Sequence, residues 1–374
     1  MDPTGDRVPH WIDTPAQLSE RLQDLPGWVG LDTEFIRERT YWPQLALVQV
    51  SIGGGASGKE VLLIDPLRPG MTDALRPLLT ASGTTKVMHS ASEDLVAFRH
   101  ACGVAPAPLF DTQIAAALAG IGGGLGYQKL VQEIAGVALE KGETRSDWLR
   151  RPLSAAQLEY AADDVRHLGM LHSMLGEKLA ALGRMDWLRA DCARLVANAD
   201  DAGERWPHLA LRSAQFLEPD AQRVLLRLLR WRDAQARSSD RPRNWILDNE
   251  LATTLARDPP ADFDALRRWL DRTPKSPRKL AEPLWRALAT PLPDEDAMPL
   301  ARNGNGEKAA LKRLQDAVAR RSRELGLPDG VLASRRWLEA LLERKQWPEA
   351  LQGWRREQLE PVLAPLLAPP PAAG

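Results

Sequence analysis

The stretch Trp28-Val29-Gly30-Leu31-Asp32-Thr33-Glu34-Phe35 lies near the start of the chain. Its first half is apolar, and its second half carries two carboxylates that are two residues apart. In an extended strand, residues at i and i+2 point to the same face of the sheet. The stretch therefore predicts a strand that presents Asp32 and Glu34 together at its end.

Three further polar residues lie at the edges of structured segments. Asp94 opens a helical pattern soon after an apolar run, and Tyr160 and Asp164 lie four residues apart in a second helical pattern. Residues with this spacing share one helical face. Neighbouring Asp163 points about 100° away from Asp164, as a surface acid would. With the two carboxylates of the strand, these residues make four acids and one phenol that a fold could gather in one cleft.

Such a set matches the needs of phosphodiester hydrolysis. Two divalent metals about 4 Å apart activate the attacking water and stabilise the leaving oxygen. The hard ions Mg²⁺ and Mn²⁺ are held by carboxylates. A phenol beside one of these carboxylates could orient the attacking water. Each residue alone has an ordinary interpretation, such as a solvated strand end or an acid in a first helical turn. Together they predict a two-metal nuclease site.

Length and composition predict a folded protein of two or three domains. The chain has 374 residues, of which 44% are hydrophobic. No apolar stretch approaches the roughly 20 residues of a membrane span, and the N-terminal residues show no signal-peptide pattern, so we expect a cytoplasmic protein without membrane partners. Cys102 and Cys192 are far apart and lack metal-ligand spacing, which argues against a disulfide framework or a zinc site. Both are predicted to be buried.

The net charge of −1 is unevenly distributed. Residues 1–200 carry 19 Lys and Arg against 25 Asp and Glu, a balance of −6, whereas residues 201–374 carry 30 against 25, a balance of +5. The first half could hold cations, and the second half could hold phosphates.

The pattern of elements predicts an α/β domain over residues 1–200. The candidate strands are 28–35, 45–52, 61–64 and 86–88. Nothing after Asp111 has a strand pattern. Helical patterns cover 112–118, 127–135 and a long stretch from Ser154 to about Ala199, where Ser154 and Gln157 form a candidate capping box.

The second half predicts helices only. Candidate helices are 221–238, 244–255, 263–270 and 280–288, followed by a further helical module at about 307–367. Two segments have the composition of linkers, 200–219 and 291–305, and the tail 368–374 is expected to be disordered. We therefore predict helical domains at 212–292 and 305–368.

Five segments of the first half resemble a known family. They are Asp32 to Phe35, Tyr41 to Leu45, Met88 to Leu95, Glu143 to Leu153 and Tyr160 to Val165. These segments resemble the ribonuclease D branch of the DEDDy 3′-5′ exonucleases. The run Leu228 to Arg232, with Pro242 and Asn249 to Leu251, is similar to an HRDC domain, a helical nucleic-acid-binding module. The resemblance covers nearly the whole chain and is weakest after residue 300.

The resemblance implies a fold, an activity and roles for residues. The fold would be an α/β ribonuclease H-like exonuclease domain followed by all-α HRDC modules. The activity would be 3′-5′ trimming of tRNA precursors and other structured RNAs by a monomer, with release of nucleoside 5′-monophosphates. Two Mg²⁺ or Mn²⁺ ions would be bound by four carboxylates, and Tyr160 would position the water. The implied metal ligands are Asp32, Glu34, Asp94 and Asp164.

Several other residues are candidates for substrate contacts near the site. They are Phe35, Arg37, Arg39, His89, Lys141 and Arg145. Proofreading relatives often carry Asn and an aromatic residue before the second motif's Asp, where this chain has His89 and Glu93. This departure favours the ribonuclease branch. Two alternatives stay open: a DNA exonuclease of the same chemistry, which would not require a 2′-hydroxyl, and a non-catalytic RNA-binding protein.

Other patterns receive ordinary interpretations. The run 53–59 nearly matches a P-loop, but Glu60 stands where Ser or Thr should bind Mg²⁺, and a strand pattern follows, so a hairpin turn is predicted. Gly122 to Gly124 is predicted to be a loop over the cleft. Eight of the 13 Trp residues follow residue 200, and most have the spacing of core residues. A candidate phosphate-binding face comprises Arg230, Arg232, Arg237, Arg241 and Arg243.

Overall fold

The chain divides into two compact units. The computed structural model describes residues 8–53, 60–139, 142, 146–199, 203–301 and 308–367. Unit 1 comprises residues 1–36, 43–200 and 306–374, and unit 2 comprises residues 37–42 and 201–305. The domain boundaries predicted from the sequence remain predictions. The near P-loop at 53–59 lies mostly outside the described residues.

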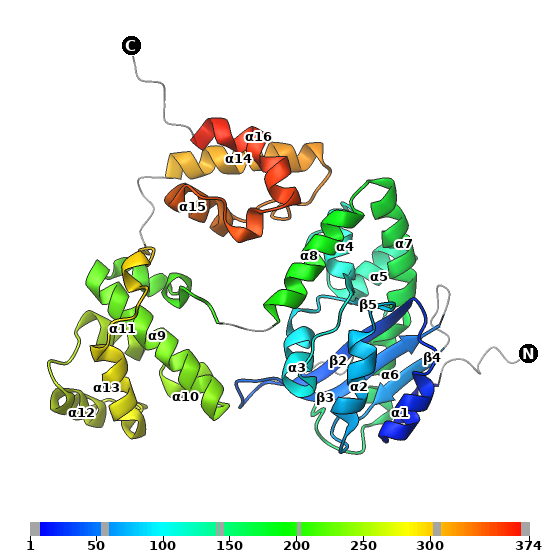
Figure 1. Ribbon diagram of the computed structural model, residues 1–374, viewed down its shortest axis with the longest axis horizontal. Helices are drawn as coiled ribbons and strands as arrows, with labels where there is room; N and C mark the ends of the chain where they lie inside the picture. Colours follow the sequence, from blue (N-terminus) through cyan, green and yellow to red (C-terminus); the bar gives the residue numbers. More distant parts are fainter. Residues whose placement is uncertain are drawn as a thin grey trace, which may run out of the picture. The chain divides into compact units, whose positions relative to one another are not determined.

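Unit 1 is built on a six-stranded mixed sheet (Figure 1). Its strands are β1 (His10–Ile12), β2 (Trp28–Ile36), β3 (Gln44–Ile52), β4 (Glu60–Ile64), β5 (Thr85–Met88) and β6 (Leu109–Asp111). The spatial order is β1-β4-β3-β2-β5-β6, with β2, β3 and β4 antiparallel and the other pairs parallel. The four predicted strands are present. The sequence patterns missed β1 and β6, which at three residues each are too short to show a period.

The central strand β2 presents its acidic end to one face of the sheet. Asp32 pairs with Gln49 of β3, and the register shifts after Glu34. Two residues before Asp32, Gly30 has no side chain, and an added Cβ would lie 3.2 Å from Leu168. Gly30, Asp32 and Glu34 are two residues apart along the strand, so they face the same side of the sheet. Both carboxylates therefore point to the side on which Leu168 lies.

Helices cover the sheet of unit 1. They are α1 (Pro15–Arg21), α2 (Met71–Thr80), α3 (Ser92–Cys102), α4 (Thr112–Leu118), α5 (Tyr127–Ala135), α6 (Ala155–Arg166), α7 (Leu168–Ala181) and α8 (Met185–Asn198). The single long helical stretch predicted for 154–199 is three helices. Its start is as predicted, because Ser154 and Gln157 form a capping box at the first turn of α6.

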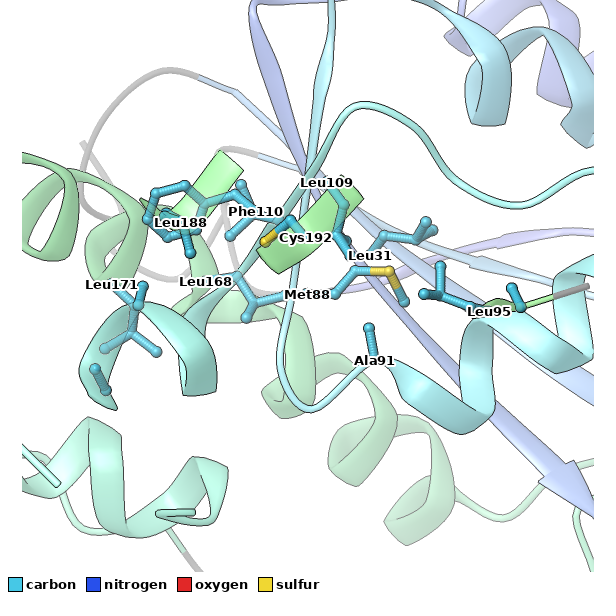
Figure 2. Packing of buried hydrophobic residues seen from close by; sticks show 14 of the residues in the cluster. Leu31, Met88, Ala91, Leu95, Leu109, Phe110, Leu168, Leu171, Leu188 and Cys192 are labelled. Carbon is cyan, nitrogen blue, oxygen red and sulfur yellow. The ribbon is translucent and has the colours of Figure 1, made fainter. Parts of the chain in front are cut away.

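The core of unit 1 is continuous. Figure 2 shows Leu31 of β2 and Met88 of β5 among side chains from β6, α3 and α8, and all of them belong to one cluster of buried residues. Cys102 and Cys192 are both free and buried, as predicted.

Residues 308–367 belong to unit 1 as well. They form α14 (Lys308–Glu324), α15 (Arg335–Arg344), the short η5 (Glu349–Leu351) and α16 (Trp354–Leu367). Their buried leucines join the same hydrophobic cluster as the sheet. We refer to these residues as the C-terminal module.

Unit 2 contains helices only, within its described residues. They are η1 (Pro207–Ala210), η2 (Arg212–Phe216), α9 (Pro219–Ser239), α10 (Arg243–Ile246), α11 (Asn249–Arg257), α12 (Phe263–Arg272), η3 (Arg278–Leu280), α13 (Ala281–Ala289) and η4 (Glu295–Ala297). The segments predicted to be linkers are packed in their described parts. His208 is buried and its Nε2 lies 2.9 Å from the Pro299 carbonyl oxygen, while Arg227 pairs with the buried Glu295. These long-range pairs give both segments fixed structure.

Unit 2 also holds the short segment 37–42, which directly follows β2. One carboxylate oxygen of Asp240 accepts hydrogen bonds from the backbone N–H groups of Tyr41 and Trp42, both at 3.0 Å. The Tyr41 ring is buried, and its hydroxyl donates to Asp233 at 3.2 Å. Arg243 donates to the Tyr41 hydroxyl at 2.7 Å and lies over its ring.

Most of the predicted phosphate-binding arginines contact other groups of unit 2. Arg230 binds Asp294, Arg232 binds the Leu247 carbonyl and Asn249, and Arg237 and Arg243 both bind Asp233. Arg241 is exposed. Within the described residues no helix is long and apolar enough to cross a membrane.

Candidate active site

A pocket of about 250 Å³ opens over the end of β2. Its lining consists of Asp32, Thr33, Glu34, His89, Tyr127, Tyr160, Asp164 and Leu168. Three of the four predicted carboxylates and the predicted tyrosine therefore share one cavity. The fourth carboxylate, Asp94, is buried next to the pocket: the Thr33 hydroxyl donates a hydrogen bond to it, and its charge acts on Asp32 and Glu34.

Each acidic side chain is placed by the end of a regular element. Asp32 and Glu34 alternate on β2, and Asp94 lies in the first turn of α3, where the helix dipole favours a negative charge. Tyr160 and Asp164 lie one turn apart on α6, and both side chains line the pocket, where the Asp164 carboxylate raises the pKa of the phenol. The spacing of four residues noted in the sequence therefore brings the two side chains to the same cavity.

Burial and neighbouring acidic side chains raise the pKa of all four carboxylates. Burial raises the pKa of Asp32 well above its usual value, and the charges of Asp94 and Asp164 raise it further. Burial followed by Asp164 and Asp94 raises the pKa of Glu34 to about 8. Burial is also the main cause that raises the pKa of Asp94 and of Asp164, each to about 7, against hydrogen bonds that lower them. Among the residues that the structure describes, no positive charge is among the main influences on these four pKa values.

Divalent cations fit this donor set. Carboxylate oxygens are the ligands that Mg²⁺ and Mn²⁺ prefer, and two cations would offset the repulsion that raises these pKa values. Within the part of the chain that the structure describes, no group of three or more His, Cys, Asp or Glu side chains is already converged for coordination.

Tyr160 is held in its protonated form. Burial, followed by the charges of Asp164 and Glu34, raises the pKa of the phenol above its usual value. Its ring packs against the buried Trp148 at a centroid distance of 6.1 Å, and Gly142 lies against the ring so closely that an added Cβ would overlap it. A protonated phenol keeps oxygen lone pairs that can accept a hydrogen bond from a water.

His89 and Tyr127 are neighbours in the lining of the pocket. His89 Nδ1 lies 2.9 Å from Thr112 Oγ1, and Nε2 lies 3.0 Å from the Leu125 carbonyl oxygen. Burial lowers the pKa of His89. The Tyr127 ring lies edge-on to the imidazole at 5.6 Å, and its hydroxyl donates to the Asp163 carbonyl at 3.1 Å. His89 was predicted from the sequence, but Tyr127 and Thr33 were not, because nothing local marks either as part of a site.

The other predicted substrate contacts have different surroundings. Phe35 follows the register shift of β2 and packs against the core of unit 1. Arg37 belongs to unit 2, where its Nε donates to the Tyr41 carbonyl at 2.8 Å. Lys141 and Arg145 lie outside the described residues.

Several known proteins are similar to this chain in sequence and fold. The family model described as 3′-5′ exonuclease matches residues 9–180. Ribonuclease D of Xanthomonas oryzae is 65% identical over 96% of this chain and 99% of its own length. The chain belongs to the ribonuclease D family. Ribonuclease D of Pseudomonas paraeruginosa is 36% identical over 94% of this chain and 96% of its own.

The fold agrees with this family. The crystal structure of Escherichia coli RNase D, described as an exoribonuclease involved in structured RNA processing, superposes with a TM-score of 0.81 at 31% identity, covering 96% of this chain and 98% of that one. The prediction of a ribonuclease H-like exonuclease domain followed by helical segments is confirmed. This ribonuclease D-family chain is a 3′-5′ exoribonuclease, and exonucleases of this kind use divalent metal ions. A non-catalytic RNA-binding role is thereby set aside.

Proposed function

We propose that this exoribonuclease trims the 3′ ends of tRNA precursors and other structured RNAs in the cytoplasm, acts as a monomer and releases nucleoside 5′-monophosphates. The observation that carries the proposal is the pocket at the end of β2, where acidic side chains and a protonated phenol share a cavity of about 250 Å³. A cavity of this size admits the last nucleotide of a single strand and no folded RNA. The structured body of the substrate would stay outside.

Four residues would hold the cations, namely Asp32, Glu34, Asp94 and Asp164. When bound, two Mg²⁺ or Mn²⁺ ions would activate the nucleophile and stabilise the charge on the attacking and leaving oxygens. The Tyr160 oxygen accepts a hydrogen bond from the attacking water and so sets its direction. The Thr33 hydroxyl fixes one carboxylate oxygen of Asp94. The remaining wall, formed by His89 and Tyr127, faces the terminal nucleotide.

The test is a trimming assay on tRNA. A 5′-labelled tRNA with a short 3′ extension is incubated in Mg²⁺ or Mn²⁺ with the wild type, Asp32→Asn, and wild type with EDTA. The matched control is Asp163→Asn, because Asp163 lies beside Asp164 but pairs with Arg166. We expect stepwise shortening to the mature end by the wild type and by Asp163→Asn alone.

Two outcomes would contradict the proposal. Full activity of Asp32→Asn would show that the pocket at the end of β2 is not the active site. Shortening that continues past the mature end, or that proceeds equally on a 2′-deoxy strand, would remove the assigned substrate and favour a DNA exonuclease of the same chemistry.

A further inference from the structure

The C-terminal module is attached to the exonuclease fold of unit 1 by a buried ion pair. Asp191 of α8 and Arg355 of α16 are 5% and 6% exposed. The two Asp191 oxygens accept from the Arg355 guanidinium at 2.5 and 2.7 Å, and Asp191 also accepts from Trp354 Nε1 at 3.1 Å. Arg355 donates from Nε to the Val331 carbonyl at 3.2 Å. A buried pair persists only when its hydrogen bonds are satisfied in this way, so the attachment is specific.

Aromatic stacking supports the same joint. The rings of Trp187 on α8 and Trp354 on α16 are stacked with centroids 4.3 Å apart and planes 7° apart. The Arg355 guanidinium lies over the Trp354 ring at 4.2 Å. Two helices that are far apart in sequence are thus joined by both polar and apolar contacts.

A second attachment reaches the end of α4. Arg184 is 7% exposed and donates to the Leu118 carbonyl at 2.7 Å and to the carbonyl of Leu325 in the C-terminal module. One guanidinium therefore joins the last residue of α4 to the residue after α14. Gly120 lies two residues after Leu118, and an added Cβ there would overlap the carbonyl oxygen of Gly326. The two backbones approach so closely that only glycine fits.

The segment that starts at Gly120 leads directly to the wall of the active-site pocket. Five residues later, the Leu125 carbonyl oxygen accepts from Gln113 Nε2 at 2.9 Å and lies 3.0 Å from His89 Nε2. Tyr127 then opens α5 and lines the pocket. The segment 120–126 is thus fixed at one end by the C-terminal module and carries, at its other end, the contacts that hold His89 and Tyr127.

We propose that the C-terminal module is a positioning element of the exonuclease site. Its Gly326 meets the start of the segment 120–126 at Gly120, and the bonds of Arg184 to Leu325 and of Arg355 to Asp191 hold the module in that place. This segment sets the place of His89 and Tyr127 against the terminal nucleotide. The proposal rests on the site assigned at the end of β2. It gives the module a role in hydrolysis that does not depend on holding the body of the RNA.

Two variants loosen the joint from opposite sides, and each has a matched control. Gly120→Ala places a methyl group against the Gly326 carbonyl; its control, Gly136→Ala, has a similar positive φ of 68° but open space around the Cβ. Arg355→Met removes the buried guanidinium; its control, Arg356→Met, removes the next arginine, which pairs with Glu360 on the surface. Thermal unfolding and near-ultraviolet circular dichroism establish which variants are folded.

The substrate separates positioning from RNA holding. A single-stranded RNA of about six nucleotides is close to what one small binding fold covers, so it does not depend on a second contact surface. On this substrate we expect Gly120→Ala and Arg355→Met each to lower kcat about tenfold with little change in KM, as small misplacements at a reacting centre do. Both controls should keep wild-type kcat.

The opposite results would overturn the proposal. Unchanged kcat on the short RNA, with weaker binding of a structured RNA, would make the module an RNA-holding element instead. An equal loss in Gly136→Ala would attribute the effect to backbone strain. An error in the assignment of the active site would be detected separately. In that case Asp32→Asn would remain active, independently of the results for Gly120→Ala and Arg355→Met.

Discussion

Glu34→Gln should make the metal-free protein more stable at alkaline pH, although it replaces an ionisable carboxyl of the active site by a neutral amide. In the wild type, burial followed by the charges of Asp164 and Asp94 raises the pKa of Glu34 from 4.5 to about 8. The folded protein therefore binds this proton more tightly than the unfolded chain does. Between these two pKa values the native state holds more protons, so its stability falls as pH rises.

The magnitude is set by the size of the shift. A rise from 4.5 to about 8 corresponds to about 5 kcal/mol of unfavourable free energy when Glu34 is ionised. Water entry and small movements of the neighbouring carboxylates relieve part of this cost. We expect Glu34→Gln to raise the free energy of unfolding by ~1–3 kcal/mol near pH 9 and by less than about 1 kcal/mol near pH 5, where Glu34 is largely neutral in the folded protein.

Urea unfolding in EDTA measures both values. The control is Glu159→Gln, which removes an exposed carboxylate of α6 that pairs with Arg166 and should change stability by less than about 1 kcal/mol at either pH. Adding Mg²⁺ reverses the comparison: the wild type, which keeps all four acids, should gain more stability than Glu34→Gln, because ligand binding to the native state stabilises it by mass action.

A stability difference between Glu34→Gln and wild type that does not depend on pH would refute this explanation. A loss of stability in the variant near pH 9 would also refute it, since Glu34 would then be compensated by a positive charge. If Mg²⁺ raised the free energy of unfolding equally in the wild type and in Glu34→Gln, Glu34 would not be a cation ligand.

Three other variants are expected to have distinct effects. Tyr160→Phe should lower kcat by about 10–100-fold on short RNA with KM nearly unchanged, as removal of a group that orients the water would; steady-state kinetics checks this, and an equal rise in KM would point to substrate binding instead. Thr33→Val should weaken Mg²⁺ affinity about tenfold by freeing Asp94, as loss of a hydrogen bond behind a metal ligand does, and calorimetry that finds no change would remove that role. Asp240→Ala should destabilise unit 2 by about 1–3 kcal/mol through loss of the bonds from Tyr41, and unchanged urea unfolding would contradict the proposed anchoring.

The local signals in the sequence predicted the catalytic end of the fold well. A strand that ends in Asp32 and Glu34, and a capping box at Ser154, are set by residues within one element, so their periods can be read directly. The four longest strands are present where expected. The common position of Tyr160 and Asp164 in the pocket is likewise set by spacing on one helix.

The features that were missed depend on distant partners. The segment before Pro219 looks like a linker because of its charges and prolines, but His208 lies against the Pro299 carbonyl, ninety-one positions away. Tyr127 opens an ordinary amphipathic helix, and only the fold brings it to the pocket. No local pattern indicates that the C-terminal module packs in unit 1 either. Asp191 and Arg355 have ordinary sequence surroundings, and only the fold brings them together as a buried ion pair.

The Tyr41–Trp42 segment limits how the chain can be shortened. It follows the catalytic strand without interruption, yet its backbone N–H groups are bonded by Asp240 and its buried tyrosine by Asp233. A protein that ends at residue 200 would lack Asp233 and Asp240. The rings of Tyr41 and Trp42 would then be exposed to solvent, and their backbone N–H groups would lose the hydrogen bonds to Asp240. Such a fragment would be prone to aggregation and to proteolytic cleavage beside the catalytic strand. A useful minimal nuclease would first need Tyr41 and Trp42 replaced by polar residues.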